Sequence, residues 1–242
     1  MPHGTPDWGH VGPKSTTYGL DDLGEHAVRL GSPHLWDRRG DVVYETNFSE
    51  GLGIFTIFLF GLGAGGTLFT GNARSGAFCV QLTGGSDGER MARLLGLIPF
   101  PRLDWFGLEF TFSVSAQTEF WRWNLVWHIN LVQYNARIQV DCVNNRLEYW
   151  GNDGLYHEFA AGVVLDESTE LHHTGKVVVN TVDWRYVRFI LNDVEYDLGQ
   201  FAVETTGALA GNYFNMAVEH VSVALSNAVA YIDSVILTQN EP

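Results

Sequence analysis

The clearest pattern along the chain is an alternation of apolar and polar residues over positions 120–134. Successive side chains of a β-strand point to opposite faces, so residues two apart share a face. The odd positions form one apolar row: Trp121, Trp123, Leu125, Trp127, Ile129 and Leu131. The even positions are mostly polar: Phe120, Arg122, Asn124, Val126, His128 and Asn130. We therefore predict a long strand whose odd face packs in a core, while its even face lies outside the sheet or lines its concave side.

From residue 41 onward almost the whole chain carries strand-like patterns, separated by clusters of Gly, Asn, Asp and Ser. Many short strands with regular turns indicate a sandwich, jelly roll or barrel, and not alternating β and α units. We predict an all-β jelly-roll β-sandwich over residues 41–242. The predicted strands are 41–48, 54–60, 76–83, 106–115, 120–134, 136–143, 146–150, 176–182, 184–191, 194–198, 215–225 and 228–238.

The first forty residues have a different character, and we predict that residues 1–40 form an N-terminal arm. Residues 1–19 are rich in Gly, Pro, Thr and His and show no strand alternation, so they are expected to be extended. A short helix is predicted at about residues 20–30, followed by the stop signals Gly31 and Pro33. Such a short helix is marginal alone in water, so it must dock on its own sandwich or on a neighbouring subunit. Its apolar face is Leu20, Leu23, Ala27 and Leu30.

The charge balance narrows the range of partners. The chain has 242 residues and a formal net charge of −14, with 45% hydrophobic and 13% aromatic residues. So much aromatic content excludes a disordered composition. The acidic balance argues against nucleic acid and against an anionic membrane surface, because both need a basic patch.

Two segments bear on the compartment. Residues 1–6 are neither basic nor strongly apolar, so we expect no secretory signal and synthesis in the cytoplasm. Residues 51–73 carry no charge, and 54–60 are strongly apolar, but glycines interrupt the stretch repeatedly. A membrane span needs about 20 mostly apolar residues, so we expect a buried strand followed by a glycine loop. Whether this strand is central in the sandwich or pairs with a neighbour stays open.

The even face of the 120–134 strand is the best candidate for a ligand site. Its donors and acceptors are of the kind that bind hydroxyl groups, although a solvated or subunit-contacting face is the stronger interpretation. Tyr149 and Trp150 precede the turn at 151–154, where an aromatic pair is either a sugar contact or a rim of the core. The candidate ligand-binding residues are therefore Arg122, Asn124, His128, Asn130, Tyr149 and Trp150.

No local pattern predicts a catalytic site. A glycoside hydrolase needs two carboxyl groups about 5–10 Å apart, and only Glu195 and Asp197 share a strand face here. An outward-facing acidic edge explains that pair more simply. Polysaccharide lyases need an Arg, a His and a Tyr that converge, and no motif groups them. The sequence has no Gly-x-Ser-x-Gly elbow. We therefore predict a chain that is not an enzyme.

Metal and cysteine signals are weak. His172 and His173 are adjacent, so on a strand they point opposite ways and do not easily bind one ion. We predict no metal site and no cofactor, with structural calcium at the acidic loops 86–89 and 152–153 as the open alternative. Cys79 and Cys142 lie in apolar strand-like runs, which favours two buried thiols over a disulfide.

Two parts of the chain carry a resemblance. Residues 22–43 contain Asp22-Leu23-Gly24-Glu25, Arg29-Leu30-Gly31-Ser32-Pro33 and Asp37-Arg38-Arg39-Gly40-Asp41-Val42-Val43. This segment resembles the start of uncharacterised bacteriophage and metagenomic virion-associated proteins that continue into a concanavalin-like β-sandwich. Residues 183–192 and 232–238 are similar to the terminal strands of concanavalin-like jelly rolls. The resemblance implies a fold and a virion setting and carries no site residue, and His26 and the apolar 51–60 run depart from the pattern.

Three functions follow, in order of preference. The first is a non-enzymatic structural protein of a virus particle, made in the host cytoplasm, such as a capsid decoration, turret or tail-associated subunit. It would assemble through its arm into a homo-oligomer and contact other virion proteins. The second is a lectin-like carbohydrate-binding module for surface adhesion, with a glycan as partner. The third is a polysaccharide-active enzyme. The predicted assembly residues are Leu20, Leu23, Leu30 and Trp36.

Overall fold

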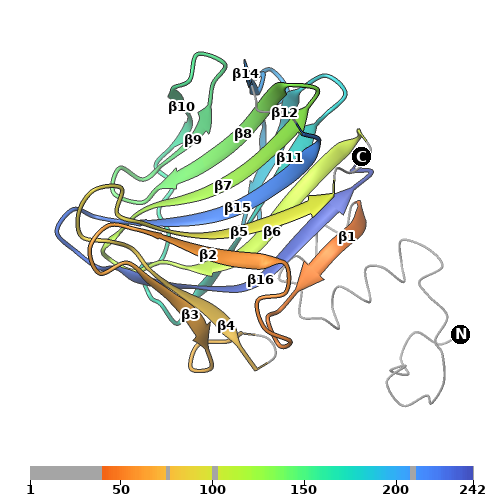
Figure 1. Cartoon of the computed structure of the whole chain (residues 1–242). Coiled ribbons are helices and arrows are strands. Elements are labelled where there is room, and N and C mark those ends of the chain that lie inside the picture. Colours follow the sequence, from red (N-terminus) through yellow and green to blue (C-terminus); the bar gives the residue numbers. More distant parts are fainter. Residues whose placement is uncertain (1–39, 75–76, 100–102, 208–210, 242) are drawn as a thin grey trace, which may run out of the picture.

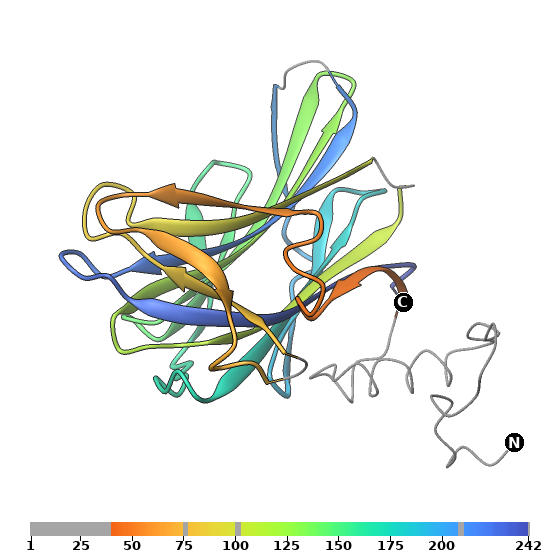
Figure 2. The same cartoon turned by 60° about the horizontal axis from the view of Figure 1, so that its bottom comes forward.

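The chain folds into two antiparallel sheets packed face to face. The computed structural model describes residues 40–74, 77–99, 103–207 and 211–241. Figure 1 shows the long strands of one sheet in the front layer and those of the other behind it, and Figure 2 shows the two layers turned by 60°. The jelly-roll β-sandwich predicted from the sequence is confirmed. The predicted arm, its helix and its assembly residues lie outside the described residues.

The strands divide evenly between the sheets. Sheet A has the order β13 (Val194–Asp197), β12 (Arg185–Leu191), β11 (His172–Asn180), β6 (Trp105–Ser113), β16 (Val229–Gln239), β4 (Cys79–Thr83) and β3 (Gly65–Phe69), and β1 (Asp41–Thr46) also pairs with β16. Sheet B has the order β10 (Tyr156–Ala161), β9 (Arg146–Trp150), β8 (Val132–Asp141), β7 (Thr118–Ile129), β15 (Tyr213–Ser222), β5 (Met91–Pro99) and β2 (Phe55–Phe60), and β14 (Glu204–Gly207) also pairs with β8.

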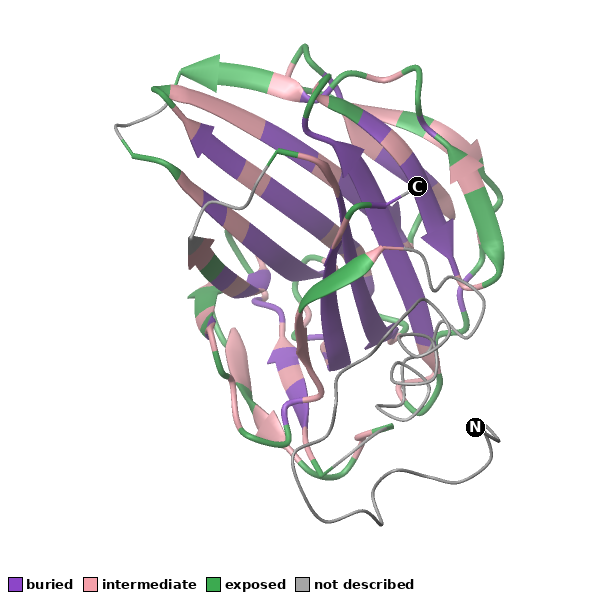
Figure 3. Cartoon of the chain, turned by 90° about the vertical axis from the view of Figure 1, so that its right-hand side faces the viewer, coloured by how far each residue is buried: buried purple, intermediate pink, exposed green. Residues whose placement is uncertain are grey.

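The core lies between the sheets and is built from the apolar face predicted for residues 120–134. Trp121, Trp123 and Trp127 are all 0% exposed. The Trp123 ring stacks on Phe110 of β6 with 4.3 Å between ring centroids, and its Nε1 donates to the carbonyl oxygen of Gly175 at 3.1 Å. A Cβ atom at Gly175 would lie 2.0 Å from Trp123 Cζ2, so only glycine lets the ring reach sheet A. Figure 3 shows how much of both sheets is buried.

The predicted strand 120–134 is wrong at its C-terminal end. β7 ends at Ile129 and β8 begins at Val132, because Asn130 and Leu131 form a two-residue hairpin turn with φ angles of 48° and 69°. Positive φ at both central residues matches the right-handed twist of the flanking strands. Asn tolerates this conformation, but Leu131 gives no such signal and is 60% exposed instead of lying in the core.

Four strands were not predicted from the sequence: β3, β5, β10 and β14. β5 was missed because its run Met91–Pro99 carries apolar residues on both faces and shows no alternation. The apolar segment 54–60 does form a strand, β2, and it is the edge strand of sheet B rather than a central one. Among the described residues, no helix is long and apolar enough to cross a membrane.

A buried ionic cluster joins the C-terminal residues to the outer face of sheet A. Lys176 Nζ lies 2.7 Å from Glu241 Oε1, and Arg188 Nη2 lies 2.5 Å from Glu241 Oε2. All three residues are at most 5% exposed. A buried carboxylate is tolerated only when cations and donors surround it, which this arrangement provides.

Candidate functional site on sheet B

The register of sheet B brings polar residues from six strands to one face. Arg122 on β7 lies opposite Gln139 on β8 and Glu219 on β15, and Asn124 lies opposite Arg137 on β8. Directly paired residues share a face, so this face points away from the core tryptophans. We call the following residues the polar face: Arg93, Glu219, Arg122, Asn124, Arg137, Gln139, Glu148, Trp150 and Tyr156.

Glu219 fixes one side of the polar face. Its Oε1 lies 2.8 Å from Arg93 Nε and accepts a hydrogen bond from Asn124 Nδ2 at 3.2 Å. Its Oε2 lies 3.8 Å from Arg122 Nη1. Glu219 is 4% exposed, so these donors compensate the desolvation of its charge. Asn124 therefore presents its nitrogen to Glu219, and its Oδ1 is buried without a partner.

A second chain of contacts orients Arg122. Gln139 donates through Nε2 to Glu148, and its Oε1 accepts a hydrogen bond from Arg122 Nε at 2.9 Å. A carboxylate only accepts, so Glu148 decides which way the Gln139 amide points. The Arg122 guanidinium also lies 4.9 Å from the Phe120 ring centroid and 5.5 Å from that of Tyr156. Arg122 is thus held by one hydrogen bond and by contacts with two rings.

Arg137 differs from its neighbours because it has no acidic partner. Its guanidinium lies 5.0 Å from the Trp150 ring centroid, and its Nε is buried without a hydrogen bond. Among the described residues, no carboxylate lies within ion-pair distance of it. The nearby Glu204 already accepts from Asn135 Nδ2 at 2.7 Å. A partly buried guanidinium left unpaired is unusual and calls for an explanation.

Tyr186 sets the position of Arg137 from the other sheet. Its hydroxyl accepts from the backbone nitrogen of Arg137 at 2.8 Å and lies 2.9 Å from the carbonyl oxygen of Trp150. The ladder between β8 and β9 ends at the pair Ile138 and Tyr149, so the phenol bridges the strands where their own pairing stops. Tyr186 is 0% exposed, which makes this bridge part of the core. The spacing of the Arg137 and Trp150 side chains is therefore built into the fold.

Tyr156 completes the cluster from the edge strand β10. Its ring meets Trp150 edge-on with 4.8 Å between centroids. Burial raises the pKa of the Tyr156 hydroxyl above its usual value, and the positive charge of Arg122 opposes that rise. The phenol therefore keeps its proton near neutral pH and is able to donate it.

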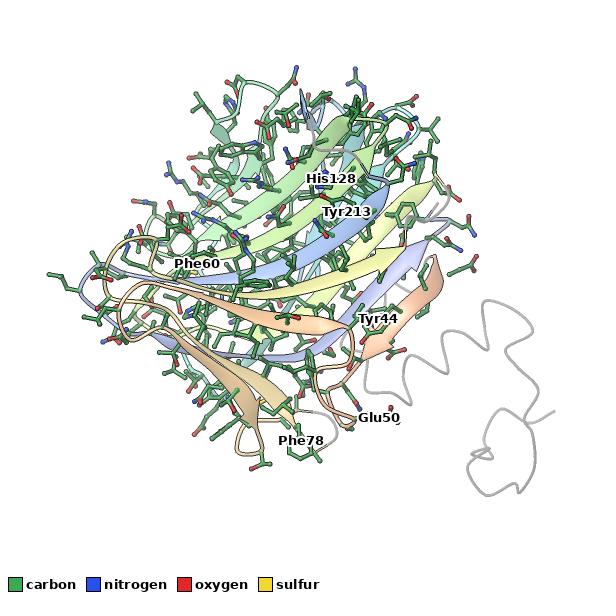
Figure 4. All side chains as sticks on the ribbon, in the orientation of Figure 1. Tyr44, Glu50, Phe60, Phe78, His128 and Tyr213 are labelled. Carbon is green, nitrogen blue, oxygen red and sulfur yellow. The ribbon has the colours of Figure 1, made fainter. Side chains whose placement is uncertain are left out.

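His128 and Tyr213 form a separate pair on the same face. The two rings stack with 4.0 Å between centroids, as Figure 4 shows near one end of the sheet. His128 lies four residues beyond Asn124 on β7, which is about 13 Å along a strand. Burial lowers the pKa of His128, so the imidazole is neutral near neutral pH. The pair therefore lies apart from Tyr156 and Arg137.

The structure separates the six sequence-predicted ligand residues. Arg122, Asn124, His128 and Trp150 lie on the outer face of sheet B. Asn130 lies in the β7–β8 turn, where its backbone nitrogen donates to Asn212 Oδ1 at 2.9 Å. Tyr149 points the other way, and its ring stacks on Phe201 with 4.0 Å between centroids, so it belongs to the rim of the core. No ligand contact tests these candidates, and they stay predictions.

Five residues of the polar face were not predicted from the sequence: Arg137, Gln139, Glu148, Tyr156 and Glu219. Arg137 and Gln139 follow from a turn at 130–131, because a two-residue hairpin fixes which residues of β8 lie opposite β7. Tyr156 and Glu219 reach the face through strand neighbours that no local signal specifies.

The other candidates lie away from this face. Glu195 and Asp197 are exposed on the edge strand β13 of sheet A. Among the described residues, no group of three His, Cys, Asp or Glu side chains is placed to hold a metal ion. In the 86–89 loop, Asp87 Oδ1 accepts a hydrogen bond from the backbone nitrogen of Leu62 at 2.6 Å. Cys79 and Cys142 are free, the first buried and the second partly buried.

Comparison with known proteins identifies the fold and not a family. The sequence matches no protein-family model and no curated protein. Alginate lyase vAL-1 from Chlorella virus is similar with a TM-score of 0.55 and 9% identity, over 82% of this chain and 100% of the lyase. The carbohydrate recognition domain of Emp46p is similar with a TM-score of 0.50 and 13% identity, over 80% of this chain and 92% of that domain. A sialidase matches 84% of this chain with a TM-score of 0.52 and 10% identity, but this chain spans only 19% of it.

At these identities the likeness defines a class of fold, the concanavalin-like jelly-roll β-sandwich, which the resemblance of the sequence segments also implied. Apart from the viral source of the lyase, these structures contain no link to a virus particle. The matched proteins are a lyase, a carbohydrate recognition domain and a sialidase, and none of them is a structural protein of a virion.

The prediction that the chain is not an enzyme is overturned. It rested on the lack of a catalytic constellation, yet Arg122, Arg137 and Tyr156 converge on one face of sheet B. The fold is also shared with an alginate lyase over the whole length of that lyase. Strand pairing, and not a linear motif, brings these residue types together.

Proposed function

We propose that the chain binds a polysaccharide with carboxylate groups on the polar face of sheet B. The observation that carries the proposal is Arg137, a partly buried guanidinium without an acidic partner among the described residues. The planar fork of arginine matches the two oxygens of a carboxylate. A uronate carboxylate would supply the anion that this position lacks, while the neighbouring arginines already have theirs.

The groups around Arg137 suit the rest of a sugar. Asn124 Oδ1 and Trp150 Nε1 are a buried acceptor and a buried donor that have no partner in the described part of the chain. One can accept from a sugar hydroxyl, and the other can donate to one. A polar ligand on this face would offer partners to both.

A titration of the folded protein with a soluble polyuronate tests this proposal. Arg137→Met should weaken binding about 10- to 100-fold, the worth of a charge-assisted hydrogen bond. Arg137→Lys should recover only part of the loss, because an ammonium does not form the two-pronged contact. Arg185→Met is the matched control, since Arg185 is exposed on sheet A and donates to the Gln200 carbonyl oxygen. Equal affinities of the wild type and Arg137→Met would refute the proposal.

A second function, cleavage of the bound chain by β-elimination, is favoured by Tyr156. In this reaction solvent takes the proton from carbon 5 of the uronate, and the electron pair forms a double bond between carbons 4 and 5. The bond from carbon 4 to the glycosidic oxygen breaks, and that oxygen needs a proton. Tyr156 is suited to donate it, because its hydroxyl stays protonated and lies beside Arg122 and Arg137. Arg137 would stabilise the charge that develops on the carboxylate.

The unsaturated product absorbs ultraviolet light, which gives a direct assay of cleavage. Tyr156→Phe should lower the rate about 10²- to 10⁴-fold, the usual contribution of a positioned proton donor, and leave polyuronate binding nearly unchanged. Tyr213→Phe is the control, because Tyr213 lies on the same face next to His128 and away from Arg137. Wild-type activity in Tyr156→Phe would exclude this role for the residue.

A further inference from the structure

The outer face of sheet B has a second half that is uncharged. Along β5, the residues that follow Arg93 on this face are Leu95 and Leu97. Leu95 lies opposite Ala217 on β15 and Thr56 on β2, while Leu97 lies opposite Asn215. Phe58 lies opposite Arg93 on the edge strand. We call Leu95, Leu97, Ala217 and Phe58 the apolar patch.

Two members of the apolar patch are exposed in spite of their composition. Leu97 is 57% exposed and Phe58 is 42% exposed. Asn215 stands at its border, and its side-chain amide has no hydrogen-bond partner among the described residues. Figure 4 labels Phe60 and Tyr213, which lie two residues after Phe58 on β2 and two residues before Asn215 on β15. The patch is thus a small apolar surface with one free amide beside it.

We infer that the apolar patch is a subsite for acyl ester groups, such as O-acetyl, on the polyuronate. An acyl group combines a methyl, which Leu95 and Leu97 can cover, with a carbonyl oxygen, to which Asn215 Nδ2 can donate a hydrogen bond. The patch carries no charge, so it suits an uncharged substituent. This inference rests on the proposed function and names the substrate class of the same face.

Position and size support this occupant. The patch is continuous with the polar face, since Ala217 lies directly opposite Asn124. β5 and β8 are three strand spacings apart, or about 14 Å, so the acylated sugar is a different residue of the chain from the one held by Arg137. Each side of a stable protein interface contributes about 20 residues, so a patch of four side chains is too small to bind a protein partner stably.

Paired titrations with one polyuronate, before and after alkaline removal of its O-acetyl groups, test the inference. The wild type should bind the acetylated polymer about fourfold more tightly, which is the effect of burying one methyl group. Leu97→Asn should abolish this preference and leave binding of the deacetylated polymer unchanged. Leu59→Asn is the control, because Leu59 is 47% exposed on the neighbouring strand but lies opposite Ala92 of the core face.

The outcomes separate this inference from the proposed function. Equal affinity of the wild type for both polymers would overturn the acyl subsite and leave the carboxylate site standing. Failure to bind either polymer would overturn the proposed function and the acyl subsite with it. A dimer of the wild type that dissociates in Leu97→Asn would assign the patch to a second copy of the chain, and would also overturn the inference.

Discussion

At the scale of single residues, the proposed binding depends on which polar groups already have hydrogen-bond or ion-pair partners inside the protein. Glu219 and Glu148 each form an ion pair with an arginine and accept a hydrogen bond from an amide side chain, so their charges serve mainly to orient other groups. Arg137 has the same kind of position but no such partner in the described chain. A ligand gains the most binding free energy at such an unpaired group. In the free protein the group is desolvated without a hydrogen bond, and the ligand supplies that bond.

His220 gives a prediction about stability rather than binding. It is 0% exposed, and its Nε2 lies 3.1 Å from Thr118 Oγ1. Burial lowers the pKa of His220 to about 3. The unfolded chain takes up a proton below the ordinary histidine pKa of about 6.5, whereas the folded chain does not until about 3. Stability from this residue is therefore complete above about pH 6.5 and is lost as the pH falls toward 3.

Denaturant unfolding of the wild type and of His220→Phe at about pH 7.5 and 4.5 measures this effect. Between these values the free energy of unfolding of the wild type should fall by about 3 kcal/mol more than that of the variant. The phenyl ring keeps the packing against Trp121, whose ring centroid lies 5.0 Å from that of His220. Parallel losses in the two proteins would show that His220 does not cause acid sensitivity.

At the scale of elements, β7 shows what a sequence pattern can establish. Its alternation predicted the core face, and Trp121, Trp123 and Trp127 are all fully buried. The same alternation placed Arg122 and Asn124 on the outer face, because the period of a strand is two. The pattern did not locate the end of the strand, since Leu131 carries no turn signal. Side-chain direction was therefore predictable where the turn was not.

The rest of the site depends on pairing between distant strands. Glu219 lies beside Arg122 and Asn124 because β15 pairs with β7. In the sequence, Asn124 and Glu219 are 95 positions apart. Tyr156 reaches the site because β10 folds back on β9, and β10 gave no alternation that would predict it. Such pairings follow from the packing of the whole sandwich, so no local reading of the sequence specifies them.

At the scale of the whole molecule, the net charge and the polar face have opposite effects on an acidic ligand. A formal net charge of −14 repels an acidic polymer at long range and slows its approach. The polar face opposes this locally, because Arg93, Arg122 and Arg137 lie on neighbouring strands of one sheet. The overall charge thus does not identify the ligand. Recognition is decided by the local arrangement of the face.

The most direct test of the central claim is a nuclear magnetic resonance titration that follows the tryptophan indole N–H signals while an oligouronate is added. The Trp150 Nε1 group is unpaired and lies beside Arg137, whereas those of Trp121 and Trp123 donate to core carbonyl oxygens. If the oligouronate binds beside Arg137, we expect the Trp150 signal to shift and the signals of Trp121 and Trp123 to stay in place. A saturable shift elsewhere, with the Trp150 signal unchanged, would contradict it.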